Sequence, residues 1–387
     1  MRHILIINRY DDEFSDYRKY IDHTQVNVSY ITMEDRSSLI DPEVSSFVVK
    51  ISILDTDIVM HEARKIHQQN PIDSVIAFSE YDLDSAAEVR TQLNINGAKT
   101  SDNQLCRNKA SMKGALKGST VRYPCYQEIS FRVDIESFCS DKGYPAILKP
   151  QAGAASEGVI KIECPEDIPE LENFSGYEIE EYIDGDIYHV DAILTNDSIP
   201  YFKVSKYINT CLDFRHGKPL GSVAIDEPDL ITTARALTQE VCKRLNLKSQ
   251  AIHLEFIESN GKLVFVEVGG RVGGGEIPFV TKRCEGIDLY ELWVQAALGV
   301  PISPMKTQIT GFLMMPNPFS GDYVFDFDME LSHPLMTYCN LSDKGENCGF
   351  SYEDIPAKVH FMGDSQEAVT NAIIQCTDIL QKSICIA

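Results

Sequence analysis

The sequence predicts a mixed fold of the α/β and α+β classes, and three patterns lead to that prediction. Residues 4–7 are a short run of β-branched and other apolar residues, which is typical of a buried parallel strand. A helical segment over residues 57–69 separates this strand from another apolar run, and strands that alternate with helices indicate a parallel sheet. Beyond residue 177 the chain is instead rich in strands, two of which flank Asn260 and Gly261.

The 387 residues exceed what one hydrophobic core holds, so we expect several structural units. The N-terminal α/β domain is expected over 1–104, with strands near 4–7, 26–31, 46–51 and 74–78. A unit over 105–185 begins with a basic helical stretch (105–118), and a larger unit follows over 186–310. Short strands and a closing helix (365–381) form the last unit, 311–387, packed on the larger one. No glycine fingerprint follows the first strand, which excludes a dinucleotide-binding dehydrogenase.

The formal net charge of −23, from 58 acidic and 35 basic residues, argues against two classes of partner. An acidic surface repels phosphate backbones and anionic lipids, so we expect no nucleic acid and no membrane. The 11 cysteines show no C-x-x-C pair, which is typical of reduced thiols. With no signal-peptide pattern and no apolar stretch of membrane-spanning length, we expect a cytoplasmic protein.

A glycine-bearing turn that follows a lysine is the first candidate site. Lys149 ends a predicted strand, and small residues follow it from Gly153 through Ser156 to Gly158. Small residues let the backbone approach a phosphate closely, and the lysine adds charge at the same place. The P-loop pattern is absent, and an ordinary flexible hairpin is the alternative interpretation.

An acidic stretch over 177–191, interrupted by Asp184 and Gly185, is the second candidate. Its carboxylates could accept hydrogen bonds from the adenine amino group and from ribose hydroxyls. A solvated acidic strand edge is the alternative.

The third candidate is a hairpin in which Glu255 and Glu267 each lie six residues from Gly261. A two-residue turn, Asn260–Gly261, would put the two glutamates on opposite faces, whereas a three-residue loop over 260–262 would put them directly opposite each other. Paired carboxylates need a cation between them, and oxygen-only ligands favour Mg²⁺. Arg271, just beyond the second strand, has the planar fork that binds a phosphoryl group. Two unrelated surface glutamates are the alternative.

In this order and spacing, the motifs resemble the ATP-grasp superfamily over about three quarters of the chain. The resemblance is strongest to carboxylate–amine ligases that join amino acids, and to related ligases that load amino acids onto carrier proteins. It implies an ATP-grasp fold with an N-terminal Rossmann-like (pre-ATP-grasp) domain, a small lid subdomain over 105–185, and a large subdomain with the metal site over 186–310.

The resemblance also implies roles for matching positions. Two lysines would hold the ATP phosphates under a glycine lid: Lys109 and Lys149, with Gly153, Ser156 and Gly158. The adenine hinge would be formed by Glu180, Glu181 and Ile183, and either Asp186 or His189 would bind the ribose. Mg²⁺, with Mn²⁺ as an alternative ion, would be bound by Glu255 and Glu267, and the acyl phosphate would be steadied by Arg271. Many members have an asparagine where this chain has Gly269, which leaves one or two metal ions open.

The implied reaction is phosphorylation of a carboxylate by ATP, followed by attack of an amine on the acyl phosphate. The acceptor could instead be the phosphopantetheine thiol of an acyl carrier protein, and a non-catalytic ATP-binding subunit is the other alternative. The carboxylate substrate would be bound by residues elsewhere in the cleft, for which the candidates are Lys206, Arg215, His216 and Arg283. Members are often dimers, so a homodimer is an expectation of the resemblance.

Overall fold

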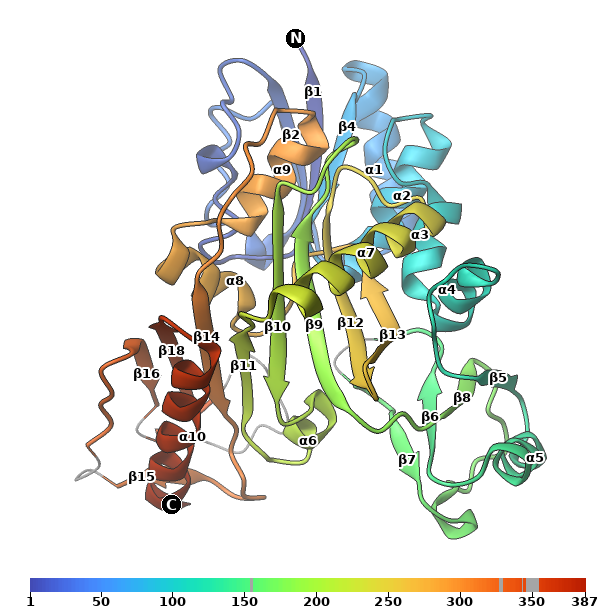
Figure 1. Cartoon of the computed structure of the whole chain (residues 1–387). Helices are drawn as coiled ribbons and strands as arrows, with labels where there is room; N and C mark the ends of the chain where they lie inside the picture. The colour runs from blue at the N-terminus through green and yellow to red at the C-terminus, as the bar shows by residue number, and fades with distance from the viewer. Residues whose placement is uncertain (154–155, 327–329, 343, 346–354) are drawn as a thin grey trace.

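The computed structural model describes residues 1–153, 156–326, 330–342, 344–345 and 355–387. Within these residues the strands form four sheets. An eight-stranded sheet runs through the centre of the molecule, with the N-terminal domain at one end and a small four-stranded sheet beside the other (Figure 1). The other two sheets are a four-stranded sheet in the N-terminal domain and a three-stranded sheet near the C-terminus.

The N-terminal domain confirms the predicted α/β class. Its strands all pair in parallel in the order β3-β2-β1-β4, and each lies within two residues of its predicted range: β1 (His3–Asn8), β2 (Asn27–Met33), β3 (Phe47–Ile51) and β4 (Ser74–Ala77). Helices α1 (Thr56–Gln69) and α2 (Leu83–Gln92) pack against the sheet. Helix α1 begins after Asp55, whose side chain accepts hydrogen bonds from two backbone N–H groups of the first turn.

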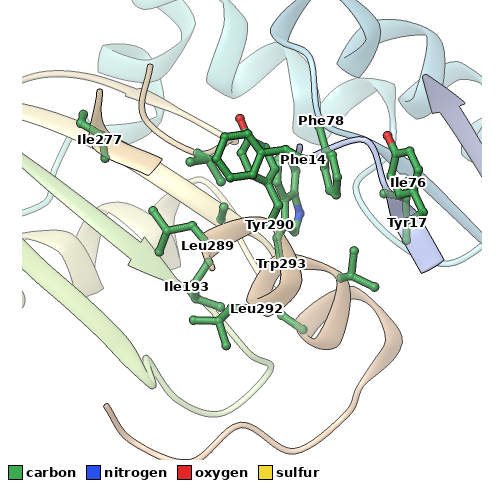
Figure 2. Packing of buried hydrophobic residues seen from close by; sticks show 14 of the residues in the cluster. Phe14, Tyr17, Ile76, Phe78, Ile193, Ile277, Leu289, Tyr290, Leu292 and Trp293 are labelled. Carbon is green, nitrogen blue, oxygen red and sulfur yellow. The ribbon is translucent and has the colours of Figure 1, made fainter. Parts of the chain in front are cut away.

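An aromatic cluster fastens this domain to the rest of the chain. Helix α9 (Leu289–Leu298) brings Tyr290 and Trp293 against Phe78, with ring centroids 4.7 and 5.2 Å away, and Phe14 lies 4.6 Å from Tyr290 (Figure 2). These side chains are buried, as expected for Trp293 from its place on an apolar helix. Helix α9 thus contacts β4 of the N-terminal sheet as well as two interior strands of the central sheet, β9 and β12.

The small unit carries the antiparallel sheet β5-β8-β6-β7: β5 (Tyr126–Ile129), β6 (Ala146–Pro150), β7 (Ile160–Ile162) and β8 (Tyr177–Glu181), with α5 (Arg132–Lys142) packed on it. The single basic helix predicted over 105–118 is two helices, α3 (Thr100–Arg107) and α4 (Lys109–Leu116). The break falls at Asn108, whose side chain caps α4 by accepting from the Ser111 N–H at 2.8 Å. Lys109 is therefore the first residue of a new helix.

The central sheet is antiparallel throughout: β9 (Asp186–Ile193), β10 (Tyr201–Ile208), β11 (Leu220–Ala224), β12 (Ala251–Ser259), β13 (Lys262–Gly269), β14 (Ile309–Met315), β16 (Met336–Leu341) and β18 (Ala357–Gly363). Helix α7 (Pro228–Arg244) crosses one face (Figure 1) and buries Val190, Leu254 and Phe256 beneath it. Because side chains alternate along a strand, the intervening residues of β9 and β12 point to the opposite face.

The C-terminal segment adds strands to the central sheet. The predicted boundary between residues 310 and 311 falls inside β14, which pairs with β11 on one side and β18 on the other. Helix α10 (Gln366–Ser383) covers this end of the sheet, and a three-stranded sheet lies beside it: β15 (Tyr323–Phe325), β17 (Lys344–Gly345) and β19 (Ile384–Ile386). By contrast, the predicted boundary at residue 185 falls in the connection between β8 and β9. Among the described residues, no helix is both long and apolar enough to cross a bilayer.

Candidate functional site

The hairpin of β12 and β13 pairs Glu255 directly with Glu267. Ser259 pairs with Lys262, so the turn has only two residues, Asn260 and Gly261, both with positive φ. The expectation that this pairing depends on a three-residue loop is therefore wrong. A register shift after Glu255 leaves one extra residue, Val266, on β13, and this β-bulge restores the pairing that the short turn would have prevented.

Two polar rows cross the face of the central sheet opposite α7. One row runs through Ser205, His189, Glu255 and Glu267, which are successive partners across β10, β9, β12 and β13. The neighbouring row runs through Lys203, Asp191, His253 and Gly269. The sheet therefore gathers two histidines and three carboxylates on one face, around the edge that the small unit approaches.

Two lysines of the small unit face this edge. The Lys109 Nζ lies 2.9 Å from Glu267 Oε2 and donates to the Gly153 carbonyl at 3.3 Å. The Lys149 Nζ, at the end of β6, lies 2.7 Å from Glu180 Oε2. The sequence-predicted lysines and Glu267 are thus brought together from different subdomains.

The charges of this cluster shift its pKa values. Burial works to raise the pKa of Glu267, but Lys109 and Lys149 outweigh it and lower that pKa below its ordinary value. Burial works to lower the pKa of Lys149, and the carboxylates of Glu180, Glu178 and Glu267 reverse this and raise it. Glu267 is therefore held ionised and Lys149 protonated, as binding of a cation and of a phosphate requires.

The glycine-bearing turn joins β6 to β7 and has an irregular backbone. Gly153, Ser156 and Gly158 all have positive φ, and residues 154 and 155 lie outside the described residues. A Cβ at Gly158 would lie 2.9 Å from a ring carbon of Pro150, so only glycine fits there. The Lys109 N–H donates to the Gln151 carbonyl at 2.8 Å, which ties the start of the turn to α4.

The predicted hinge lies at the junction of β8 and β9. Glu180 is buried and faces Lys149, whereas Glu181 points to the other face of β8 and accepts from the Cys125 N–H at 3.0 Å. Ile183 lies half-buried in the connection that follows. The structure thus separates the side chains of the two hinge glutamates.

Two other predicted residues, Asp186 and Lys206, lie apart from the carboxylate pair, and a third, His189, is enclosed beside Glu255. Asp186, the exposed first residue of β9, binds Lys206 Nζ at 2.5 Å. Lys206 pairs with Tyr188 in the sheet, on the α7 face, so the predicted substrate contact by Lys206 is not brought to Glu255. His189 is fully buried, with Nδ1 2.7 Å from Asp191 and Nε2 2.7 Å from Ser222, so both of its ring nitrogens already have protein partners.

A hydrogen-bonded relay lies next to the carboxylate pair. The Nδ1 atoms of His189 and His253 bind different oxygens of Asp191, at 2.7 and 2.9 Å, and His253 Nε2 lies 3.6 Å from Glu255 Oε1. The potential ligand atoms of these three side chains all lie within 4.8 Å of one another. Because the Nδ1 atoms of both His189 and His253 are already bound to Asp191 oxygens, we interpret the cluster as a relay and not as a metal site.

Asp191 and the histidines of the relay shift one another's pKa values. Burial works to raise the pKa of Asp191, but the two histidines outweigh burial and lower it. Burial works to lower the pKa of His253, but Asp191 outweighs burial and raises it to about 9.

The glycine run after Arg271 packs over this relay. A Cβ at Gly273 would lie 2.4 Å from Asp191 Oδ1, so the absence of a side chain at this glycine allows the close packing against the relay.

Arg271 is anchored by the N-terminal domain. Its Nε binds Glu80, in the 3-10 turn Glu80–Asp82 that follows β4, and Arg107 binds the other oxygen of the same carboxylate. Burial works to lower the pKa of Arg271, and Glu80 raises it. The remaining candidates lie further out: Arg215 ends the short helix α6 (Cys211–Arg215), His216 is exposed beside it, and Arg283 stacks 4.1 Å over the Tyr338 ring.

The residues present fit a magnesium ion. Glu255 and Glu267 offer facing carboxylates whose side chains are 19% and 31% exposed, so both remain partly accessible to solvent. Glu255 also accepts from the Tyr207 hydroxyl at 3.1 Å, which orients it. Two protein carboxylates are a usual complement for Mg²⁺, which keeps waters and substrate phosphate oxygens as its other ligands.

The sequence reasoning missed several members of the site. A local signal existed for three of them. Lys113 lies four residues after Lys109 on the same face of its helix, and Glu178 and His253 each lie two residues before a predicted glutamate on the same face of a strand. Tyr207 and Glu80 carried none, because they reach the site through pairings between distant segments.

Comparisons with known proteins agree with this geometry. Residues 106–275 match the family model described as ATP-grasp domain. The L-arginine-specific L-amino acid ligase of Bacillus subtilis is 22% identical over 308 residues, which cover 75% of this chain and 74% of the relative. The crystal structure of an L-amino acid ligase from Bacillus licheniformis superposes with a TM-score of 0.75 at 16% identity, covering 100% of this chain and 99% of the other. An N5-carboxyaminoimidazole synthetase from Staphylococcus aureus, complexed with ADP, gives a TM-score of 0.70 at 15% identity and 97% coverage of both chains.

Proposed function

The chain contains an ATP-grasp domain and adopts the ATP-grasp fold, and on that premise we propose that it is an ADP-forming ligase that activates an amino acid or similar carboxylate with ATP and joins it to an amine. The observation that supports this most is the pairing of Glu255 with Glu267, with Lys109 reaching Glu267 from the small subdomain. A site for a phosphorylated, metal-bound substrate needs this combination of facing carboxylates and convergent cations. A non-catalytic nucleotide-binding chain would have no need to keep it.

The nucleotide would lie between the two subdomains. Lys109 and Lys149 would bind its phosphates, under the glycine turn that includes Gly153, Ser156 and Gly158. The adenine would meet Glu180 and the backbone around Glu181 and Ile183, and Asp186, at the exposed start of β9, is better placed for the ribose than the enclosed His189. Glu255 and Glu267 would bind Mg²⁺, which when bound neutralises phosphate charge and orients the phosphoryl group.

The phosphoryl transfer would depend on charge placed in advance. Arg271, aligned by Glu80, would bind the developing acyl phosphate with its planar fork, and Lys149 would neutralise charge on the other side. The glycine turn would exclude water, which otherwise hydrolyses the mixed anhydride. The amine acceptor then attacks the acyl carbon and releases phosphate.

The carboxylate of the substrate would be bound by Arg215 or Arg283 at the rim of the site. We prefer an amine acceptor because the relatives of similar length are named as amino acid ligases. A carrier-protein thiol is the alternative acceptor, and Mn²⁺ is an alternative ion. The homodimer also stays a proposal, which light scattering tests.

Release of ADP from Mg-ATP, measured across a panel of amino acids with hydroxylamine as the acceptor, tests the proposal. Hydroxamate formed with one acid identifies the donor and supports acyl transfer; amines and a carrier protein, added next, identify the acceptor. ATP binding without turnover across a broad panel of carboxylates would contradict the proposal and favour a non-catalytic chain.

A further inference from the structure

A second lysine of α4 is enclosed behind the predicted phosphate-binding pair. Lys113 follows Lys109 by four residues and lies on the same face of the helix. Its side chain is 0% exposed, and its Nζ donates to Glu178 Oε1 at 2.7 Å and to Glu180 Oε1. The ring of Tyr126 lies 4.4 Å from the same nitrogen and adds a cation–π contact.

Lys113 and Lys149 hold the Glu180 carboxylate from both sides. Lys113 binds Oε1, whereas Lys149 binds Oε2 at 2.7 Å. The neighbouring Glu178, two residues earlier on β8 and on the same face, shares Lys113 and lies 3.9 Å from the Lys149 nitrogen. The second carboxylate oxygen of Glu178, Oε2, is buried and has no hydrogen-bond partner among the described residues.

The charge of this cluster favours an anion. Burial, together with the nearby Glu180, raises the pKa of Glu178 to about 7, so near neutral pH its carboxyl group carries less than one full negative charge on average. Two lysines then face less than two full negative charges. Without Lys113, Lys149 would be the sole cation beside two buried carboxylates, and a phosphate would have to compete with Glu180 for it.

We propose that Lys113 is a positioning residue of the nucleotide site: by binding Glu180 Oε1 it supplies that carboxylate with a permanent partner and so frees Lys149 to bind a phosphate of the nucleotide. The inference rests on the proposed function in one respect, the assignment of Lys149 to the phosphates. Because the Lys113 side chain is fully buried in the small subdomain, it would touch neither substrate nor metal.

The test measures ADP affinity by titration calorimetry, together with thermal stability, in the full-length chain. Lys113→Met removes the cation but leaves Glu178 unpaired, so the double variant Lys113→Met/Glu178→Gln restores the charge balance and keeps the fold. We expect the double variant to bind ADP about 10- to 100-fold more weakly, the loss typical of a hydrogen bond to a charged group, at nearly unchanged melting temperature. Lys117→Met, an exposed lysine on the adjoining turn, is the matched control and keeps both values.

A second variant distinguishes charge from packing. Lys113→Arg keeps the cation and is expected to bind ADP more tightly than the double variant; equal affinities of these two would overturn the inference. An ADP affinity of the double variant equal to that of the unaltered protein would overturn it as well. ADP binding by the unaltered protein without hydroxamate formation contradicts the proposed function alone, whereas no ADP binding at all contradicts both.

Discussion

Glu255 and Glu267 face each other on one side of the β12–β13 hairpin because a β-bulge compensates for a two-residue turn. Without the extra residue, Val266, the short turn would direct the two carboxylates to opposite faces of the sheet, one toward the site and one toward the core beneath α7. The bulge therefore brings the two carboxylates of the proposed metal site to the same face. Bulges beside active sites have this effect of redirecting a side chain.

Replacement of Glu267 tests the metal site. Glu267→Gln removes the charge but keeps the shape, and we expect Mg-dependent ADP release to fall by about 100-fold or more, because the ion contributes several kcal/mol of charge stabilisation. Glu258→Gln is the matched control on the same hairpin, since its side-chain oxygen can still accept from the Gly261 N–H. Equal activity of the two variants would remove Glu267 from the metal site.

Arg271 is predicted to act in phosphoryl transfer. We expect Arg271→Met to lower kcat by about 100- to 1,000-fold, the loss typical of removing one preorganised group at developing charge. Arg107→Met is the control: it also deprives Glu80 of one of its two arginine partners, but it leaves Arg271 in place. A similar loss of kcat in both variants would mean that Arg271 acts only through Glu80, and steady-state kinetics of the two variants decide this.

In the glycine run after β13, an added side chain is predicted to be harmful at Gly273 and harmless at the neighbouring Gly274. Gly273→Ala places a Cβ against Asp191, and we expect about 1–3 kcal/mol of destabilisation, typical of overpacking, together with reduced activity. Gly274→Ala has no atom within 4 Å of the added Cβ, so its stability should stay within about 0.5 kcal/mol of the unaltered protein. Urea unfolding compares them, and equal stability would contradict the tight packing over the relay.

Glu178 predicts a characteristic dependence of stability on pH. Its pKa is raised from 4.5 to about 7 in the folded chain, so between these values the folded state binds a proton that the unfolded state has lost. The resulting stabilisation is complete below about pH 4.5 and is lost as the pH rises through 7.

The comparison with Glu178→Gln isolates this effect. The glutamine cannot ionise, so the difference in unfolding free energy between variant and unaltered protein should change by on the order of 1–3 kcal/mol from pH 5 to 8, in favour of the variant at the higher pH. His253, whose pKa is raised to about 9, loses its own contribution as the pH rises from 6.5 through 9, but equally in both proteins. A difference that does not change with pH would contradict the raised pKa of Glu178.

Much of the fold follows from local patterns in the sequence. Apolar runs located β1 to β4, and the helical segment over 57–69 located α1, each within two residues, because these elements depend mainly on their own local sequence. The expected boundary between residues 310 and 311 falls inside β14, whose sheet partners, β11 and β18, lie far away in the chain and leave no local signal.

Part of the candidate site could likewise be predicted from the sequence, and part could not. Spacing within the hairpin predicted the pair Glu255 and Glu267, and the resemblance to the ATP-grasp superfamily pointed to Lys109 and Lys149. The hairpin reaches the expected pairing through a bulge that no turn rule predicts. The relay of His189, Asp191 and His253 exists because β9 lies between β10 and β12, and the anchor of Arg271 is Glu80, 191 residues away. Such pairings depend on tertiary packing, which the sequence does not display locally.

Transfer of ¹⁸O from the substrate carboxylate to phosphate tests the central claim most directly. Once the amino acid donor is identified, the enzyme is incubated with the ¹⁸O-labelled acid, Mg-ATP and the amine, and the released phosphate is analysed by ³¹P NMR. Activation as an acyl phosphate predicts that each amide formed leaves one ¹⁸O atom in inorganic phosphate, with ADP as the other product. Amide formation with unlabelled phosphate, or with release of AMP and pyrophosphate, would contradict the account.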